Sequence, residues 1–107
     1  LNDKEGVAST LHQTGLLLTH TGNNVEAQRC YTASLGLARM LNNRYLIAVI
    51  LGSLGKLALE ENKTEEAQML WEESLSLFKE LNTKEVEMVQ EWLRTINNTA
   101  FASAKRN

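Results

Sequence analysis

The two histidines are the first side chains of this 107-residue chain to examine for catalysis or metal binding. His12 and His20 lie eight residues apart, a spacing that on one helix separates them by about 12 Å along the axis. Neither is followed four residues later by a cysteine or a carboxylate, so the sequence predicts no metal site. We expect both imidazoles to be solvated or to line a groove.

Cys30 is the only cysteine, so the chain has no internal disulfide. A catalytic thiol needs a neighbouring base and a lowered pKa, whereas Cys30 precedes Tyr31 inside a predicted helix, where a small packing side chain is the simpler interpretation. The glycines lack the Gly-Lys-Ser/Thr pattern of a phosphate-binding loop. Because no acid, base and nucleophile can be combined, we predict that the protein is not an enzyme and uses no cofactor.

An acidic cluster surrounds one predicted turn between helices. It consists of Glu60, Glu61, Glu65 and Glu66. The last two fall in the first turn of a predicted helix, where the helix dipole favours negative charge. A solvated patch explains the cluster, and contact with a basic partner is the alternative interpretation.

The overall composition excludes several classes of protein. The chain is 43% hydrophobic and 22% charged and has no proline, which is too apolar for a disordered segment and unlike a turn-rich all-β domain. No apolar run approaches the roughly 18 residues of a membrane span, no secretory leader is recognisable, and a net charge of −2 argues against a nucleic-acid surface. We therefore expect a soluble, cytoplasmic protein with no membrane or nucleic-acid partner.

The elements that carry these side chains belong to a repeat with a period of about 40 residues. Many residues are identical to the residue 40 positions later, without any gap. The identities include Ala8/Ala48, Leu11/Leu51, Gly15/Gly55, Leu17/Leu57, Glu26/Glu66, Ala27/Ala67, Gln28/Gln68, Ser34/Ser74, Leu35/Leu75, Leu37/Leu77, Leu41/Leu81 and Asn42/Asn82. Apolar residues recur at three- and four-residue steps within each unit, so each unit is predicted to be a helical hairpin. We expect helices over 5–20, 25–41, 44–60, 65–81 and 84–102.

Three local signals mark the turns and the packing of these hairpins. Thr64 is expected to cap the helix that follows it, and Gly22 is expected to supply a left-handed turn. Gly15 and Gly55 lie in the middle of first helices, where glycine is costly, so we expect the backbone of the second helix to approach closely there. Aromatic side chains are then expected to fill the space between neighbouring hairpins. The predicted repeat-packing core is Leu11, Gly15, Ala27, Tyr31, Leu51, Leu54, Gly55, Ala67 and Trp71.

The spacing of the core residues resembles the tetratricopeptide repeat. The pattern reads Leu51-x2-Leu54-Gly55-x2-Ala58 and then Ala67-x3-Trp71, and it is repeated as Leu11-x2-Thr14-Gly15-x2-Leu18 and then Ala27-x3-Tyr31. The chain departs from the family in having leucine for the initial tryptophan, Thr14 for an apolar residue, and Arg39 and Lys79 in place of the closing proline. The long period is similar to that of the long-repeat subclass of this family.

The resemblance implies an all-α, right-handed solenoid of two helical hairpins and a C-terminal capping helix. We assign residues 1–4 to an inter-repeat junction, 5–42 and 43–82 to the two repeats, 83–104 to the capping helix and 105–107 to a tail. The capping helix carries an apolar stripe flanked by Trp92 and an opposite polar face. The stripe is Val86, Val89, Leu93, Ile96 and Ala100, and the polar face is Glu87, Glu91, Arg94 and Asn98.

The resemblance also implies a concave groove lined by the first helix of each hairpin. The candidate groove residues are Ser9, His12, Gln13, Leu16, Thr19, Val49, Gly52, Ser53, Lys56 and Leu59. Hydroxyls, amides and exposed leucines suit an extended or helical peptide. The set lacks the several basic residues and asparagines with which some family members hold a C-terminal carboxylate. We therefore predict a protein–protein interaction module, a scaffold or sensor arm of a larger multidomain protein, that binds a peptide or protein segment of unknown identity.

A structural module that self-associates without a peptide ligand is the alternative. The chain opens on an inter-repeat junction, so we expect it to be part of a longer array. The first helix would then leave Val7, Leu11 and Leu18 partly open, and an open apolar surface favours association. We predict self-association of this chain through its N-terminal hairpin.

Overall fold

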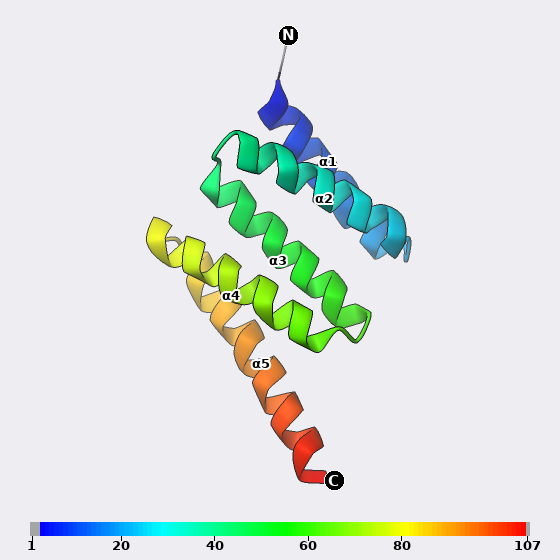
Figure 1. Ribbon diagram of the computed structural model, residues 1–107, viewed down its shortest axis with the longest axis vertical. Coiled ribbons are helices and arrows are strands. Elements are labelled where there is room, and N and C mark those ends of the chain that lie inside the picture. The colour runs from blue at the N-terminus through cyan, green and yellow to red at the C-terminus, as the bar shows by residue number, and fades with distance from the viewer. Residues whose placement is uncertain (1–2, 107) are drawn as a thin grey trace.

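Five α-helices follow one another and pack in sequence in the computed structural model of the chain (Figure 1). They are α1 (Lys4–His20), α2 (Asn24–Met40), α3 (Arg44–Glu60), α4 (Thr64–Leu81) and α5 (Glu85–Arg106). The structure describes the backbone of residues 3–106 and the side chains of residues 3–98. Residues 1–2 of the expected junction, the side chain of Ala100 and residue 107 of the expected tail lie outside the described residues. The predicted helix bounds differ from these by at most one residue, except that α5 continues beyond residue 102 to Arg106.

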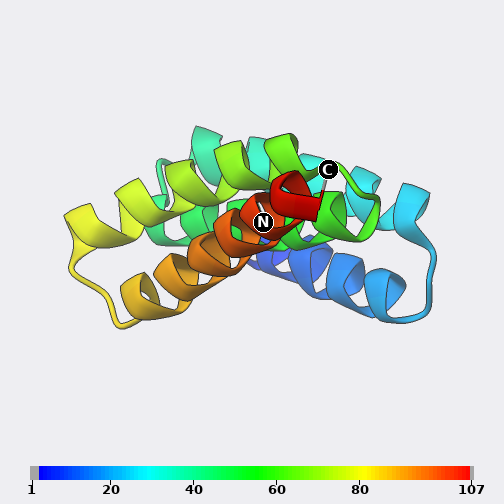
Figure 2. The ribbon, with the colours of Figure 1, turned by 90° about the horizontal axis from the view of Figure 1, so that it is seen from below.

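The helices form two antiparallel hairpins and a fifth helix. α1 packs against α2, α3 packs against both α2 and α4, and α5 packs against α4. Figure 2 shows the resulting arch, with α2 and α4 on one side and α1 and α5 on the opposite side. This arrangement confirms the predicted all-α fold of two hairpins and a C-terminal helix. No helix among the described residues is both long enough and apolar enough to cross a membrane.

A left-handed residue closes each turn between consecutive helices. These residues are Gly22 (φ 84°), Asn42 (φ 52°), Asn62 (φ 63°) and Asn82 (φ 54°), and they are evenly spaced along the chain. Glycine and asparagine are the residues that accept this conformation most readily, so the left-handed turn predicted at Gly22 is confirmed. The predicted cap at Thr64 is wrong, because Thr64 is the first helical residue and the N-cap position is taken by Lys63, whose side chain makes no capping hydrogen bond.

Gly15 and Gly55 leave room for an aromatic ring in each hairpin. A Cβ atom built on Gly15 would lie 2.5 Å from Cε1 of Tyr31, and one on Gly55 would lie 2.2 Å from Nε1 of Trp71. Both distances are far below van der Waals contact, so the glycines are packing residues. The expected reason needs correction, because the close neighbour is the side chain of the second helix rather than its backbone.

Two apolar clusters hold the arch together. The first joins the two hairpins and contains Ala27, Tyr31, Ala38, Ile47, Ile50, Leu51 and Leu57. The second joins the second hairpin to α5 and contains Ala48, Ala58, Ala67, Trp71, Phe78, Val89 and Ile96. Of the predicted core residues, Leu11 and Leu54 are only half-buried, and the others are buried.

Buried serines tie each second helix to its first helix by equivalent hydrogen bonds. Ser34 Oγ donates to the carbonyl oxygen of Ala8 at 2.6 Å, and Ser74 Oγ donates to that of Ala48 at 2.7 Å. Both serines are fully buried, so satisfying each hydroxyl avoids the cost of an unpaired polar group. The same bond at equivalent positions of the two hairpins shows that the repeat is a repeat of contacts as well as of residue types.

Candidate functional site

A hollow opens on the inner side of the arch, where side chains of α1, α3 and α5 meet. Its volume is about 260 Å³. We call it the inner hollow, and its lining residues are Leu16, Tyr45, Ala48, Val49, Gly52, Ser53, Lys56, Phe78, Glu85, Met88 and Trp92. Only Phe78 comes from a second helix, α4. The hollow is mainly apolar, with few polar groups, as is usual for binding sites in proteins.

The structure divides the ten candidate groove residues into three groups. Leu16, Val49, Gly52, Ser53 and Lys56 line the inner hollow. Ser9, Gln13 and Leu59 are exposed but are not among its lining residues. His12 and Thr19 make hydrogen bonds within the repeat array.

His12 is a contact between the two hairpins rather than a solvated groove residue. It is only 6% exposed, and its Nε2 lies 2.8 Å from Oγ of Ser53 on α3. Its ring is tilted against that of Tyr31, with 5.7 Å between centroids. Burial lowers the pKa of His12 from its usual value, because the charged imidazolium loses hydration there. His12 therefore positions Ser53 at the edge of the inner hollow.

Thr19 is turned toward its own hairpin. Its Oγ1 donates to the carbonyl oxygen of Gly15 at 2.9 Å and lies 3.0 Å from the hydroxyl of Tyr31. The pKa of Tyr31 is raised, first because its phenol is buried. Thr19 thus helps to satisfy a buried hydroxyl and is not among the residues that line the inner hollow.

Trp92 of α5 is the largest lining side chain that the sequence prediction missed. Its ring is 5.2 Å from that of Trp71, and a Cβ atom on Gly52 would lie 3.5 Å from its Cζ3. Trp92 thus covers the space left open by Gly52. Since Trp92 stands one repeat period after Gly52, continuing the repeat register into the last helix would have found it.

Lys56 places a cation beside this aromatic wall. Its Nζ lies 4.3 Å from the centroid of the Trp92 ring, a distance at which a cation is attracted to the aromatic face. None of the ion pairs of the described residues includes Lys56. The ammonium group therefore remains able to pair with an anionic or hydrogen-bonding ligand.

Tyr45 and Glu85 also line the inner hollow, from α3 and α5. The Tyr45 hydroxyl donates to the Glu85 carboxylate. This hydrogen bond lowers the pKa of Glu85 and raises the pKa of Tyr45. The hollow therefore offers a ligand an apolar wall, the Lys56 ammonium group and the Glu85 carboxylate, which already accepts a hydrogen bond from Tyr45.

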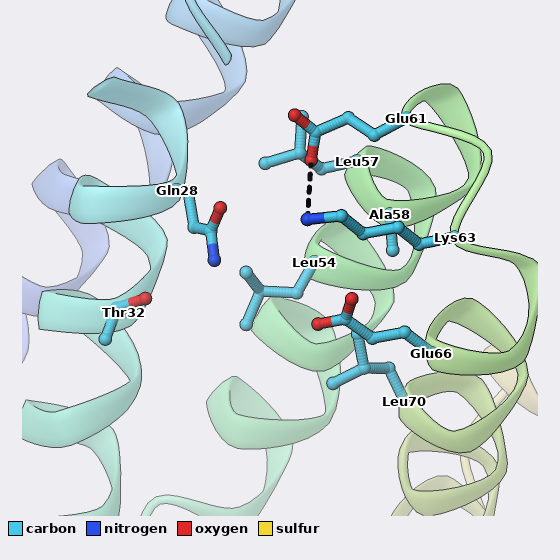
Figure 3. A pocket seen from close by; sticks show the side chains of 9 residues that line it. All are labelled: Gln28, Thr32, Leu54, Leu57, Ala58, Glu61, Lys63, Glu66 and Leu70. Atoms are coloured by element: carbon cyan, nitrogen blue, oxygen red, sulfur yellow. Dashed lines mark ion pairs between the residues drawn. The ribbon is translucent and has the colours of Figure 1, made fainter. Parts of the chain in front are cut away.

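A second, smaller hollow lies between the hairpins (Figure 3). It is lined by Gln28, Thr32, Leu54, Leu57, Ala58, Glu61, Lys63, Glu66 and Leu70. Glu61 and Lys63, both from the turn between α3 and α4, point toward one another, with 3.7 Å between Oε1 and Nζ. The charges inside this hollow are mixed and partly paired, so they favour no class of ligand. Glu60, Glu61, Glu65 and Glu66 of the acidic cluster are all exposed.

Metal and thiol chemistry have no further support in the described part of the chain. Within residues 3–98 no three side chains of histidine, cysteine, aspartate or glutamate gather as metal ligands. Cys30 is half-buried in α2.

The two hairpins match a known sequence family. A family model described as tetratricopeptide repeat matches residues 6–80. The match runs from α1 to the last turn of α4 and so includes both hairpins, whereas α5 lies beyond it. No curated protein matches the chain.

Proposed function

Because the chain belongs to the tetratricopeptide repeat family, whose repeats form protein–protein interaction modules, we propose that its inner hollow binds a segment of a partner protein. The matched domain is of a kind that is typically non-catalytic, so binding rather than catalysis is the inferred role. The period of about 40 residues, longer than that of the standard repeat, supports placing the chain in the long-repeat subclass. Such a module suits a scaffold or sensor arm of a larger multidomain protein.

The convergence of three helices on one apolar hollow is the observation that carries this proposal. Leu16, Val49 and Met88 reach it from α1, α3 and α5, and Trp92 forms its wall. Leu16 and Met88 are 41% and 44% exposed, so a ligand that covers them gains hydrophobic stabilisation. Exposed apolar side chains surrounded by polar groups are typical of a recognition surface.

The chemistry of the hollow defines the kind of segment that fits. An apolar side chain of the ligand packs against Met88 and Trp92, and hydrogen-bonding groups of the ligand reach Lys56 at the rim. An extended or helical peptide supplies both at neighbouring positions. The single cation favours such a mixed contact over the grip on a C-terminal carboxylate that uses several basic residues.

Selection from a library of random dodecapeptides displayed on phage tests the proposal. The selected peptides are synthesised and titrated against the wild-type chain and against Leu16→Asp and Met88→Asp, which put charge into the apolar wall. We expect each variant to weaken binding by about tenfold or more, because a buried unpaired carboxylate is costly. Met69→Asp is the matched control, since Met69 is 71% exposed on α4. Equal affinity of all four proteins would refute the inner hollow as the binding site.

Self-association is the second candidate function, and the exposure of α1 favours it. Val7 and Leu17 are 51% and 64% exposed on the first helix, while Leu11 and Leu18 are half-buried. Light scattering of the chain over a range of concentrations tests this candidate. A mass that stays at that of a monomer up to high micromolar concentration would exclude it.

A further inference from the structure

The inner hollow carries one charge of each sign. Among the described residues that line it, only Lys56 and Glu85 are charged. Neither takes part in an ion pair within the described part of the chain. The Glu85 carboxylate accepts a hydrogen bond from the Tyr45 hydroxyl, but a carboxylate has room for several donors. Both charges are therefore able to pair with charges of a ligand.

The two charges lie at different levels along α5. The Lys56 ammonium group lies 4.3 Å from the centroid of the Trp92 ring, so Trp92 marks its level. Glu85 precedes Trp92 by seven residues on the same helix, which corresponds to about 10 Å along the axis. Met88 lies between them, and steps of three and four residues put these three side chains on one face of α5. The hollow therefore presents a cation and a carboxylate with an apolar side chain between them.

The wall that α1 contributes adds no charge to this pattern. Leu16 lines the hollow from α1, and no aspartate, glutamate, lysine or arginine occurs from residue 6 to residue 19. Ser9 and Gln13, which are exposed on the same helix, are polar and neutral. Depletion of charged side chains is typical of the centre of a protein interface. Lys56 and Glu85 therefore set the charge pattern that a ligand has to match.

The separation of the two charges favours a helical ligand over an extended one. In a helix, residues seven apart share one face and are separated by about 10 Å along the axis. In an extended strand, side chains on one face recur at about 7 Å and then 13 Å, and neither value matches. A hollow of about 260 Å³ holds side chains rather than a whole helix, which is about 10 Å across. Such a helix lies along the rim and inserts its apolar side chain.

We propose that the partner segment is an amphipathic helix whose acidic side chain pairs with Lys56 and whose basic side chain, seven residues later, pairs with Glu85. An apolar side chain three or four residues after the acidic one packs against Met88. This inference rests on the function proposed above and adds the conformation, the charge pattern and the direction of the bound segment.

The direction of the ligand follows from its helix dipole. An acidic side chain is favourable near the N-terminus of a helix and a basic one near its C-terminus. The ligand helix therefore runs from the level of Trp92, where the Lys56 ammonium group lies, to the level of Glu85. Because α5 runs from Glu85 to Trp92, the two helices are antiparallel.

A phage library of helical peptides tests the pattern. Its sixteen-residue peptides consist of alanine and glutamine except at positions 4, 7, 8 and 11, which are randomised. The wild-type chain should select an acidic residue at position 4, an apolar residue at position 7 or 8, and lysine or arginine at position 11. Selection against Lys56→Glu should replace the acidic residue by a basic one and keep the basic residue at position 11.

Titration of selected peptides, synthesised with blocked ends, measures each charge pair. Exchanging the acidic residue of the peptide for lysine should weaken binding to the wild-type chain by about tenfold, and Lys56→Glu should restore it. Glu85→Gln keeps an oxygen for the Tyr45 hydroxyl and should remove the preference for a basic residue over glutamine at position 11. Lys79→Glu is the matched control, because it changes the net charge equally at an exposed residue of α4 outside the hollow. Circular dichroism verifies that every variant is folded.

Two altered peptides test the conformation and the direction. Proline at position 9 breaks a helix and should weaken binding by about tenfold or more. A peptide in which the acidic and basic residues exchange places should bind more weakly than the original, because its charges then oppose its own helix dipole. Undiminished binding of the proline peptide would overturn the helical conformation, and equal binding of the exchanged peptide would overturn the antiparallel direction.

The outcomes separate this inference from the function on which it rests. Peptides whose binding is weakened by Leu16→Asp and Met88→Asp, but whose charges are random or insensitive to Lys56→Glu, would overturn the charge pattern while leaving the inner hollow as a binding site. If neither this library nor the random dodecapeptides yield a peptide whose binding depends on Leu16 and Met88, the proposed function fails as well.

Discussion

Replacing Gly55 by alanine should destabilise the protein, although alanine is the better helix former. The new Cβ would lie 2.2 Å from Nε1 and 2.4 Å from Cδ1 of Trp71, so the indole has to move. That movement breaks the 2.9 Å hydrogen bond from Nε1 to the carbonyl oxygen of Gly52 and disturbs the contact with the ring of Trp92.

The expected size of the effect follows from these contacts. Overpacking a core costs about 1–3 kcal/mol, an unsatisfied buried donor adds about 1–3 kcal/mol, and the gain in helix propensity returns up to about 1 kcal/mol. The free energy of unfolding should therefore fall by about 3 kcal/mol. For a domain of this length that lowers Tm by roughly 12–24 °C.

Thermal and urea unfolding of Gly55→Ala and Gly36→Ala measure the effect. Gly36 is an exposed residue within α2, and a Cβ there would have no neighbour within 4 Å, so Gly36→Ala should raise stability by about 0.5–1 kcal/mol. The cost of Gly55→Ala should largely disappear in a Trp71→Leu background, where the indole is absent. A Gly55→Ala protein as stable as the wild type, or a cost that persists without Trp71, would refute the explanation.

Three further predictions concern other parts of the array. Trp71→Ala should lower the free energy of unfolding by about 3–5 kcal/mol, because Trp71 is 3% exposed and joins the second hairpin to α5. A shift in Tm of only a few degrees would contradict this role. Burial lowers the pKa of His12 in the folded protein, so the unfolded state binds a proton more readily as the pH falls below about 6.5, and the free energy of unfolding should decrease there. In His12→Gln this part of the decrease should be missing. Equal pH profiles of stability for the two proteins would disprove the role of His12. Asn62→Ala should lower the free energy of unfolding by about 1 kcal/mol, because φ is 63° at this residue, whereas Asn62→Gly should lower it little. Chemical unfolding of both variants decides whether the left-handed backbone causes the loss of stability.

The amino-acid sequence already contained the repeat, the helices and their pairing. The identities between the repeats and the three- and four-residue spacing of apolar side chains placed the helix bounds of the two hairpins within one residue of those observed, since both signals are local properties of the chain. The sequence also indicated close packing at Gly15 and Gly55, because glycine is costly in the middle of a helix. What approaches them was not evident, because spacing along a helix does not reveal which atom of the neighbouring helix comes nearest.

The composition of the inner hollow depends on how the helices stack. Helical periodicity shows which residues share a face, but the angle between neighbouring helices determines whether that face opens to solvent or meets another helix. His12 and Thr19 lie on the expected face and yet bond to Ser53 and Tyr31. Trp92 enters the hollow because α5 packs beside α4, so its ring covers the space beside Gly52. Such contacts join residues of different helices, and only the packed arrangement of those helices brings them together.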